Sequence, residues 1–204
     1  MALTTLADVK EFLGIPTADT THDALLTNLI NRMSSFIEGY CDRVFEATDY
    51  AEQYDGVKYN NGVLLLNQYP IISVTSLYDD PERAFGSGTE VASADFVFYD
   101  REGLVKLDGS TFSEGLKSIK IEYRAGYESG NIPADLSQAC IDLVAFKFVA
   151  RESGSGALKS ERLADAAKTY SDAVIGSSVG SGVAVPPQTE AVLNKYRRRK
   201  LYVF

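Results

Sequence analysis

The stretch Ile132–Arg151 constrains the fold most strongly, because it predicts a helix that is apolar on most of its faces. Pro133 lies where a helix loses nothing by lacking an amide hydrogen, and its fixed φ suits the first turn. Asp135 lies in the same turn, where a carboxylate favours the positive end of the helix dipole. Apolar residues then recur around the helix: Leu136, Ala139, Cys140, Ile141, Leu143, Val144, Ala145, Phe146, Phe148 and Val149. A helix of this kind is buried, so we expect it to be the centre of the fold.

The composition is that of an ordinary globular chain. Its 204 residues are 45% hydrophobic and 24% charged, which suits one domain, or one domain with a small insertion, without disulfides. Cys41 and Cys140 lie among apolar neighbours in predicted helices, so buried free thiols are favoured over a disulfide. No apolar run is long enough to span a membrane, and we expect no signal peptide at the N-terminus.

Two helices are predicted before the central one. The first follows a capping box at Thr5–Asp8 and ends at Gly14. The second follows another capping box, at Thr20–Asp23, and continues as far as Val44. Steps of three and four residues give each helix one buried face. The predicted faces are Leu6, Val9, Phe12 and Leu13, and then Leu26, Leu29, Ile30, Met33, Phe36, Ile37, Tyr40 and Val44.

From Ala47 to Gly126 the apolar period changes to two, which indicates strands. Ser118–Arg124 alternates cleanly. Phe96–Tyr99 and Leu104–Leu107 flank a short loop that ends in glycine, which predicts a hairpin. Val63–Leu66 and Ile71–Tyr78 are predicted to form another pair, and Pro81–Ala94 a surface excursion. We therefore expect a small antiparallel sheet or barrel between the second and the central helix.

The part after the central helix is less regular. Ser153–Gly156 and Gly176–Gly182 are flexible breaks. Ser160–Ala173 is helical by its alanine content and extended by its position, and both alternatives stay open. Pro186 and Pro187 open a terminal helix that runs to about Arg198. Its predicted apolar side consists of Ala191, Val192 and Tyr196, with Leu193 adjacent.

The predicted fold class is therefore α+β. A mainly helical core of three to four helices would comprise residues 1–46 and 127–175, with a small antiparallel β domain, 47–126, inserted between the second and central helices. Residues 176–204 would form a linker and an extended C-terminal docking helix and tail.

Nothing in the sequence marks a catalytic or cofactor site. The single histidine, His22, lies in a helix N-terminal turn, where exposure to solvent is expected. Gly176–Gly180 matches G-x-S-x-G but lacks the strand and helix that a nucleophile elbow needs. No Cys/His pair has metal-binding spacing. Asp79, Asp80 and Glu82 suit a solvated turn better than a cation site. We therefore expect no cofactor and no metal, and although a pair of carboxylates for hydrolysis stays open, nothing singles one out as an enzyme site.

The C-terminus is the most informative surface feature. The last ten residues carry five bases and no acid, whereas the rest carries 15 bases and 28 acids. An acidic body argues against general nucleic-acid binding. Arginine and tyrosine dominate protein contacts, so this segment is predicted to dock on a partner. Its residues are Lys195, Tyr196, Arg197, Arg198, Arg199, Lys200, Leu201, Tyr202, Val203 and Phe204.

The order of these parts resembles the head–tail connector, or adaptor, family of tailed bacteriophages. The resemblance covers most of the chain, and the joint order and spacing of its segments carry it. The matching segments are Leu3–Gly14, Asp23–Arg43, Leu66–Val74, Tyr123–Tyr127, Ile132–Leu136, Leu158–Leu163 and Leu193–Arg198.

The resemblance implies a structural virion protein at the neck, made in the host cytoplasm. Such proteins form a ring, usually of twelve copies, that docks beneath the portal through the C-terminal segment. The opposite side receives tail-completion or tail terminator proteins. The resemblance also places Ser160, Glu161, Arg162 and Leu163 near a neighbouring subunit. In relatives a glycine-aspartate and a short strand follow this stretch, whereas this sequence runs Ala164-Asp-Ala-Ala-Lys168 after Leu163, which could be helical instead.

The charge pattern suits a closed ring. A head-to-tail contact that closes needs two different complementary patches on each copy, which an acidic body and a basic tail provide. An acidic lumen would repel DNA phosphates, so DNA would pass through without specific binding. Two alternatives remain: another phage tail-completion ring protein, or a small hydrolase or carbohydrate-binding protein that uses carboxylates of the β region.

Overall fold

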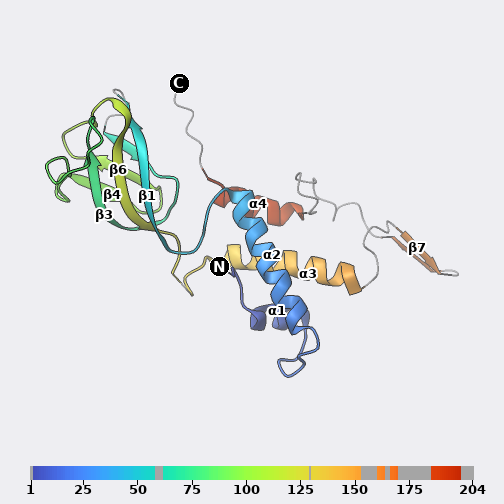
Figure 1. Cartoon of the computed structure of the whole chain (residues 1–204). Helices are drawn as coiled ribbons and strands as arrows, with labels where there is room; N and C mark the ends of the chain where they lie inside the picture. The colour runs from blue at the N-terminus through green and yellow to red at the C-terminus, as the bar shows by residue number, and fades with distance from the viewer. Residues whose placement is uncertain are drawn as a thin grey trace. The chain divides into compact units, whose positions relative to one another are not determined.

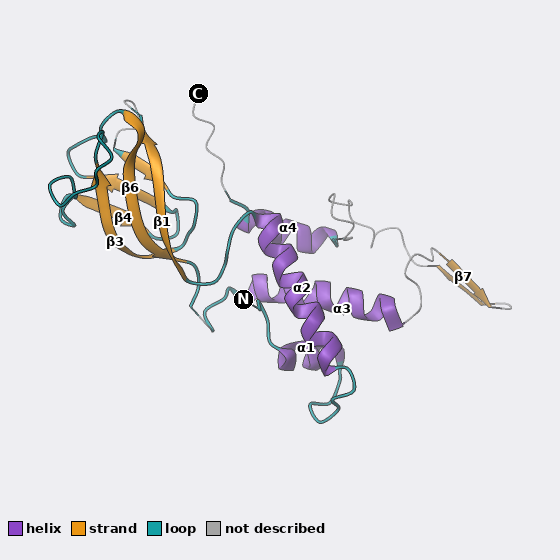
Figure 2. Cartoon of the chain, in the orientation of Figure 1, coloured by secondary structure: helices purple, strands orange, loops and turns teal. Residues whose placement is uncertain are grey.

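The computed structural model describes residues 2–57, 62–128, 130–152, 160–163, 166–169 and 185–198. The chain forms two compact units, residues 1–42 with 132–204 and residues 43–131. The first unit holds the described helices and a two-stranded hairpin, and the second holds two three-stranded sheets, so the predicted mixture of helices and antiparallel sheets is confirmed (Figures 1 and 2). We call the first the helical unit and the second the β unit.

In the helical unit, the described helices are α1 (Leu6–Leu13), α2 (Asp23–Cys41), α3 (Ala134–Glu152) and α4 (Pro187–Tyr196). Helix α3 packs against each of the other three, as expected of a central helix. Leu136, Leu143 and Val144 of α3 are fully buried, together with Leu26 and Ile37 of α2. Burial of such side chains stabilises a fold by about 1.5–3 kcal/mol each. The helical unit is therefore built around the apolar stretch Ile132–Arg151.

The observed helix ends agree with those predicted from the sequence in some places and differ from them in others. Thr5 caps α1 through a reciprocal bond with Asp8, and Gly14 ends that helix with a left-handed φ of 68°. The capping box predicted at Thr20–Asp23 is wrong, because the N-cap of α2 is His22, which makes no side-chain cap bond. The Asp23 carboxylate instead accepts a bond from Lys10 Nζ at 2.8 Å.

Two predicted apolar faces need correction. Helix α2 ends at Cys41, since Asp42 adopts a left-handed φ of 53°, so Val44 lies beyond it. Phe12 and Val149, expected inside, are 54% and 56% exposed. On α1 the buried neighbour is Lys10, whose ammonium also donates to the carbonyls of Thr17 and Asp19. Three partners satisfy this buried cation, so Lys10 can be buried beside Val9, which was predicted to face inward and is fully buried.

The β unit contains two three-stranded antiparallel sheets. One has the order β1 (Thr48–Gly56), β6 (Gly115–Ala125), β3 (Ile71–Asp79), and the other β2 (Val63–Leu65), β5 (Leu104–Leu107), β4 (Phe96–Tyr99). Their inner faces share one core, which includes Leu64, Leu77, Val105, Ile119, Ile121 and Tyr123. The predicted β4–β5 hairpin is confirmed, with Gly103 at a φ of 67° in its turn.

The predicted pairing of Val63–Leu66 with Ile71–Tyr78 is wrong. Strand β2 pairs with β5, and β3 pairs with β6. Alternation along a strand tells which residues face the core, but it carries no information on which strand lies alongside. The short turn between the two segments therefore joins strands of different sheets.

Candidate assembly surfaces

The C-terminal helix α4 is packed on the helical unit through one face. Thr189, Leu193 and Tyr196 are its buried residues, and their spacing of four and three is that of a helix stripe. The Cys41 thiol donates to the Leu193 carbonyl at 3.5 Å, and the Tyr40 hydroxyl donates to Asn194 Oδ1 at 2.9 Å. The part of the predicted docking segment that lies in α4 is therefore anchored to its own chain.

Asp135 joins the end of α4 to the start of α3. Its carboxylate accepts bonds from Lys195 Nζ at 2.7 Å and from the Tyr196 hydroxyl. Partial burial works to raise the pKa of Asp135, but the Lys195 and Tyr196 bonds outweigh it, so this pKa lies below its usual value. The aspartate expected to favour the helix dipole thus also holds the C-terminal helix.

Asp42 is a second acid that contacts the C-terminal segment, just after the end of α4. Arg198 donates from its guanidinium to Asp42 Oδ2 at 2.7 Å and from its amide to the Cys41 carbonyl at 2.8 Å. Arg197 is exposed, with its guanidinium 5.8 Å from the centre of the Tyr40 ring. The four described docking residues, Lys195, Tyr196, Arg197 and Arg198, therefore all make contacts within the chain. Residues 199–204 lie outside the described part.

The predicted subunit-contact residues Ser160–Leu163 form strand β7. It pairs with β8 (Ala166–Thr169) as an antiparallel hairpin, with Ser160 opposite Thr169. The extended alternative for these two segments is therefore correct, and the helical alternative is wrong. In the described part of the chain the hairpin is a separate two-stranded sheet.

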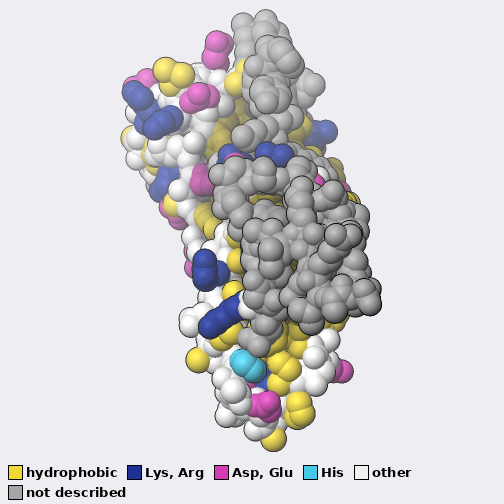
Figure 3. All heavy atoms as spheres, turned by 90° about the vertical axis from the view of Figure 1, so that its right-hand side faces the viewer, with side chains coloured by type: hydrophobic (Ala, Val, Ile, Leu, Met, Phe, Trp, Pro, Cys, Tyr) yellow, Lys and Arg dark blue, Asp and Glu magenta, His cyan; other side chains and the backbone are white. Residues whose placement is uncertain are grey.

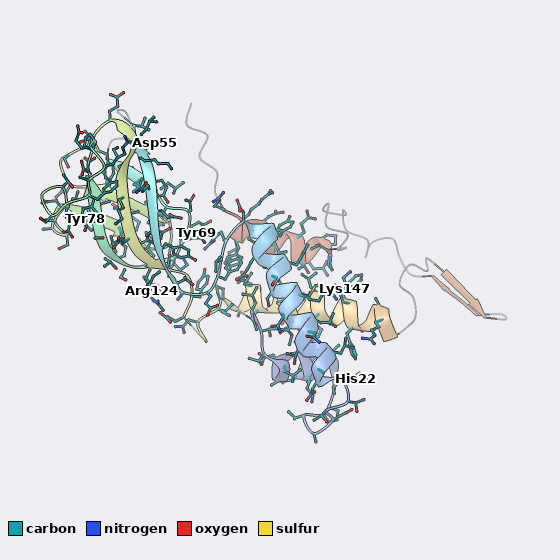
Figure 4. All side chains as sticks on the ribbon, in the orientation of Figure 1. His22, Asp55, Tyr69, Tyr78, Arg124 and Lys147 are labelled. Carbon is teal, nitrogen blue, oxygen red and sulfur yellow. The ribbon has the colours of Figure 1, made fainter. Side chains whose placement is uncertain are left out.

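The acidic residues of the β unit are the candidates for a hydrolytic site. Asp55 lies at the opposite end of the β1–β6 ladder from Arg124 (Figure 4). Asp55 accepts a bond from the Lys117 amide at 2.8 Å. Asp95, Asp100 and Glu102 are exposed in turns. Among the described residues no three His, Cys, Asp or Glu side chains are placed to hold a metal ion.

Asp80 organises a turn. It is 3% exposed and accepts bonds from the amides of Glu82 at 2.9 Å and Phe85 at 2.7 Å. Burial works to raise the pKa of Asp80, but the bonds from the Phe85, Glu82 and Ala84 amides outweigh it and lower this pKa. These bonds favour the ionised form of Asp80 and fix the turn around it, which is the arrangement of a structural group.

Sequence reasoning missed a polar cluster inside the β unit. The Glu52 carboxylate accepts bonds from the hydroxyls of Tyr54 and Tyr123, the latter at 2.7 Å, and from Asn67 Nδ2 at 3.2 Å. Burial raises the pKa of Tyr54 and of Tyr123, and the bond to Glu52 adds to the effect. The Asn67 amide donates to Tyr54 and the Gln68 amide to Tyr123, so the cluster holds the turn after β2. The inward tyrosines at Tyr54 and Tyr123 were its only sequence signal.

The other candidate reactive groups are also structural. His22 is half-buried, with its ring edge-on to Phe148 at 5.3 Å between centroids, so the expected exposed turn is only partly correct. Cys41 and Cys140 are buried and form no disulfide, as predicted, and burial raises the pKa of the Cys140 thiol to about 11. The G-x-S-x-G match lies outside the described residues. No described helix combines the length and apolarity needed to cross a membrane.

A family model described as head completion protein matches residues 2–157. The match covers well over half of the chain. The chain belongs to the head completion protein family. The predicted resemblance to a phage connector family is therefore confirmed.

Solved structures support the same fold for this head completion protein. Two similar chains come from a neck of an empty gene transfer agent particle computed with C6 symmetry and from a neck of a native particle computed with C12 symmetry. The identities are 18% and 17%, and both TM-scores are 0.55. The alignments cover 97% and 98% of this chain and 91% of each neck chain. A search of curated proteins gives no match.

Proposed function

We propose that this protein is a head–tail connector at the neck of a phage-like virion. The observation that carries the proposal is the family match over residues 2–157. Similarity of fold to chains in the necks of gene transfer agent particles supports it, since the aligned region includes nearly all of both chains. In this role the protein links the head, once filled with DNA, to the tail.

The connector acts as a closed ring, and we propose twelve copies. The similar neck computed with C12 symmetry supports this number, and the C6 neck is compatible with it because six divides twelve. A closed ring uses head-to-tail contacts between two different patches of each copy. We propose that the hairpin beginning at Ser160–Leu163 lies near one such contact, and that DNA passes through an acidic lumen without specific binding.

We further propose that the C-terminal segment docks on the portal, with a tail-completion protein on the opposite side. Because Lys195, Tyr196 and Arg198 contact Asp135 and Asp42, their role is to hold α4 in place. Contact with the portal then falls mainly to residues 199–204, which combine two bases with Leu201, Tyr202, Val203 and Phe204.

Deletion of residues 199–204 tests the docking role. The deletion leaves the Asp135 and Asp42 contacts in place, so the protein should fold and form rings. We expect co-purification with portal rings to be lost or reduced at least tenfold. Lys195→Ala is the matched control, because it removes a base that already has a partner within the chain, and it should retain portal binding. Undiminished binding of the deletion variant would refute docking by this segment.

A further inference from the structure

The β7–β8 hairpin has two outer edges. Its strands, Ser160–Leu163 and Ala166–Thr169, pair with each other in one continuous antiparallel register. In the described part of the chain no third strand joins this sheet, so each strand pairs on one side only. The hairpin also makes no extensive contact with any other described helix or strand. Within the described chain, both outer edges are therefore open to pairing with a further strand.

A hairpin of this size is marginal by itself. A two-stranded sheet in water needs further strands or a packed helix to be stable. The two strands contain one large apolar residue, Leu163, so burial of an apolar face contributes little. They also contain Glu161, Arg162 and Lys168, and charged residues on edge strands keep isolated sheets from pairing at random. Further pairing is therefore expected only where other contacts already bring two copies together.

The two edges are unlike, which is what a head-to-tail ring requires. One edge belongs to β7 and the other to β8, and the two strands run in opposite directions. When copies are related by rotation about one axis, every β7 points the same way and every β8 points the opposite way. If β8 of one copy lies beside β7 of the next, the two strands are antiparallel, and the pattern repeats around the ring without a break.

We propose that β8 of each copy pairs with β7 of the next copy, so that the hairpins form one closed antiparallel belt. This inference rests on the proposed ring and names one of its contacts. Closing the sheet gives every edge a partner, which is how barrels remove free edges. On the face drawn in Figure 3, basic and acidic side chains of the described residues are interspersed, so charge marks out no competing contact surface there.

The size of the belt agrees with twelve copies around DNA. At the proposed copy number, two strands from each of twelve copies make twenty-four strands. With a spacing of about 4.8 Å and a tilt of about 40°, these strands close into a barrel about 48 Å across. Barrels with fewer strands, such as porins, already enclose an aqueous channel. The belt therefore surrounds a channel wide enough for a DNA duplex.

Disulfide cross-linking between separately mutated copies tests the belt. Copies with Glu161→Cys are assembled with copies that carry Lys168→Cys, and disulfide-linked dimers are measured on a denaturing gel. We expect dimers from the mixture and none from either variant alone, because equal positions in adjacent copies are two strands, about 10 Å, apart. Two further pairs, Glu161→Cys with Ala166→Cys and Leu163→Cys with Lys168→Cys, detect a register shifted by two residues in either direction.

A control and a second measurement accompany the cross-linking. Gln188→Cys, at an exposed position of α4, is the control partner for Lys168→Cys and should give no dimers. Replacing residues 160–169 by glycine and serine should leave the helical unit folded, since the hairpin contributes little to its described packing. The replacement should raise the concentration needed for assembly by about tenfold or more, because the cross-strand pairs between copies are lost. Circular dichroism checks the fold, and native mass spectrometry counts the copies.

The outcomes separate the belt from the proposed function. Rings that give dimers with none of the three cysteine pairs would overturn the belt and leave the ring standing. Rings that assemble at an unchanged concentration after residues 160–169 are replaced would overturn it as well. A wild type that stays monomeric, even with portal present, would contradict the ring and the belt together.

Discussion

The two units of this protein are held together in different ways. The β unit is a continuous segment, 43–131, and its polar cluster at Glu52 ties its own strands to its own turn. The helical unit is assembled from separate segments, and its polar contacts at Asp135 and Asp42 join parts far apart in the sequence. The comparison suggests that the β unit is stable by itself, whereas the helical unit depends on the return of α4.

The largest expected effect comes from a substitution that disrupts the core of the helical unit alone. Leu143 is fully buried in α3, so Leu143→Ala should destabilise the helical unit by about 3–4 kcal/mol through lost burial and a residual cavity. Hydrogen exchange read by mass spectrometry should show faster exchange in α2, α3 and α4, with exchange in β6 unchanged. Val149→Ala, on the exposed side of the same helix, is the control and should change stability by less than about 0.5 kcal/mol. Equal acceleration in both units would contradict their independence.

Glu52→Ala is the counterpart in the β unit. It leaves the hydroxyls of Tyr54 and Tyr123 without their carboxylate acceptor, so we expect a loss of about 3 kcal/mol confined to residues 43–131. Urea unfolding followed by hydrogen exchange measures it, and Gln53→Ala, next to it and exposed, is the control. A helical unit that loosens as much as the β unit would refute the comparison.

The same cluster predicts the response of the β unit to alkali. The pKa of Tyr54 and of Tyr123 is raised in the folded state, first by burial. Stability from these groups is therefore complete below their unfolded pKa, near 10, and falls as the pH rises above it. Unfolding curves between pH 8 and about 11 should show the β unit weakening before the helical unit. If the stability of the β unit does not change over this pH range, the hydrogen bonds of Tyr54 and Tyr123 to Glu52 are contradicted.

Asp135→Asn tests the contact that holds α4. Because the carboxylate is partly exposed and screened by solvent, the expected loss is about 1–2 kcal/mol, read as faster exchange in residues 187–196. The folded pKa of Asp135 is lowered, so its contribution is present above its unfolded pKa, near 4, and disappears as the pH falls below it. Asp142→Asn on the same helix is the control. Unchanged exchange in α4 at neutral pH would show that α4 is held by its apolar face alone.

The smallest expected effect concerns the start of the helical unit. Thr5→Ala removes the side-chain cap of α1 and should cost about 1 kcal/mol, whereas Thr5→Ser keeps the acceptor and should be nearly neutral. Thermal unfolding of the two variants side by side gives the difference. A loss from Thr5→Ser as large as that from Thr5→Ala would rule out the capping bond as its cause.

The helices were largely predictable because their signals are local. Thr5, Gly14 and Pro133 mark ends, and the apolar period of α3 gives its burial. The strand partners were not predictable, since β2 and β3 alternate in the same way and only the tertiary core decides their neighbours. Lys10 was missed because its burial depends on carbonyls of the following loop, which no pattern in the sequence marks.

The predicted docking segment also shows that contacts which depend on the folded unit cannot be predicted from local sequence signals. The basic residues were identified, but Gly/Ser breaks suggested a tether, and the contacts of Lys195 and Arg198 with Asp135 and Asp42 depend on the folded unit. One local signal was available: Thr189, Leu193 and Tyr196 repeat at helical spacing and are the residues that are buried. This spacing predicts a helix that packs on its own chain, not one that projects freely from it.

The copy number of the assembled protein tests the central claim most directly. Native mass spectrometry of the purified chain, alone and with portal rings, should give a single closed oligomer, and electron microscopy should show a ring with a central channel. Twelve copies are the expected number. A monomer of 22.2 kDa in both conditions would contradict a connector built from identical neighbouring subunits.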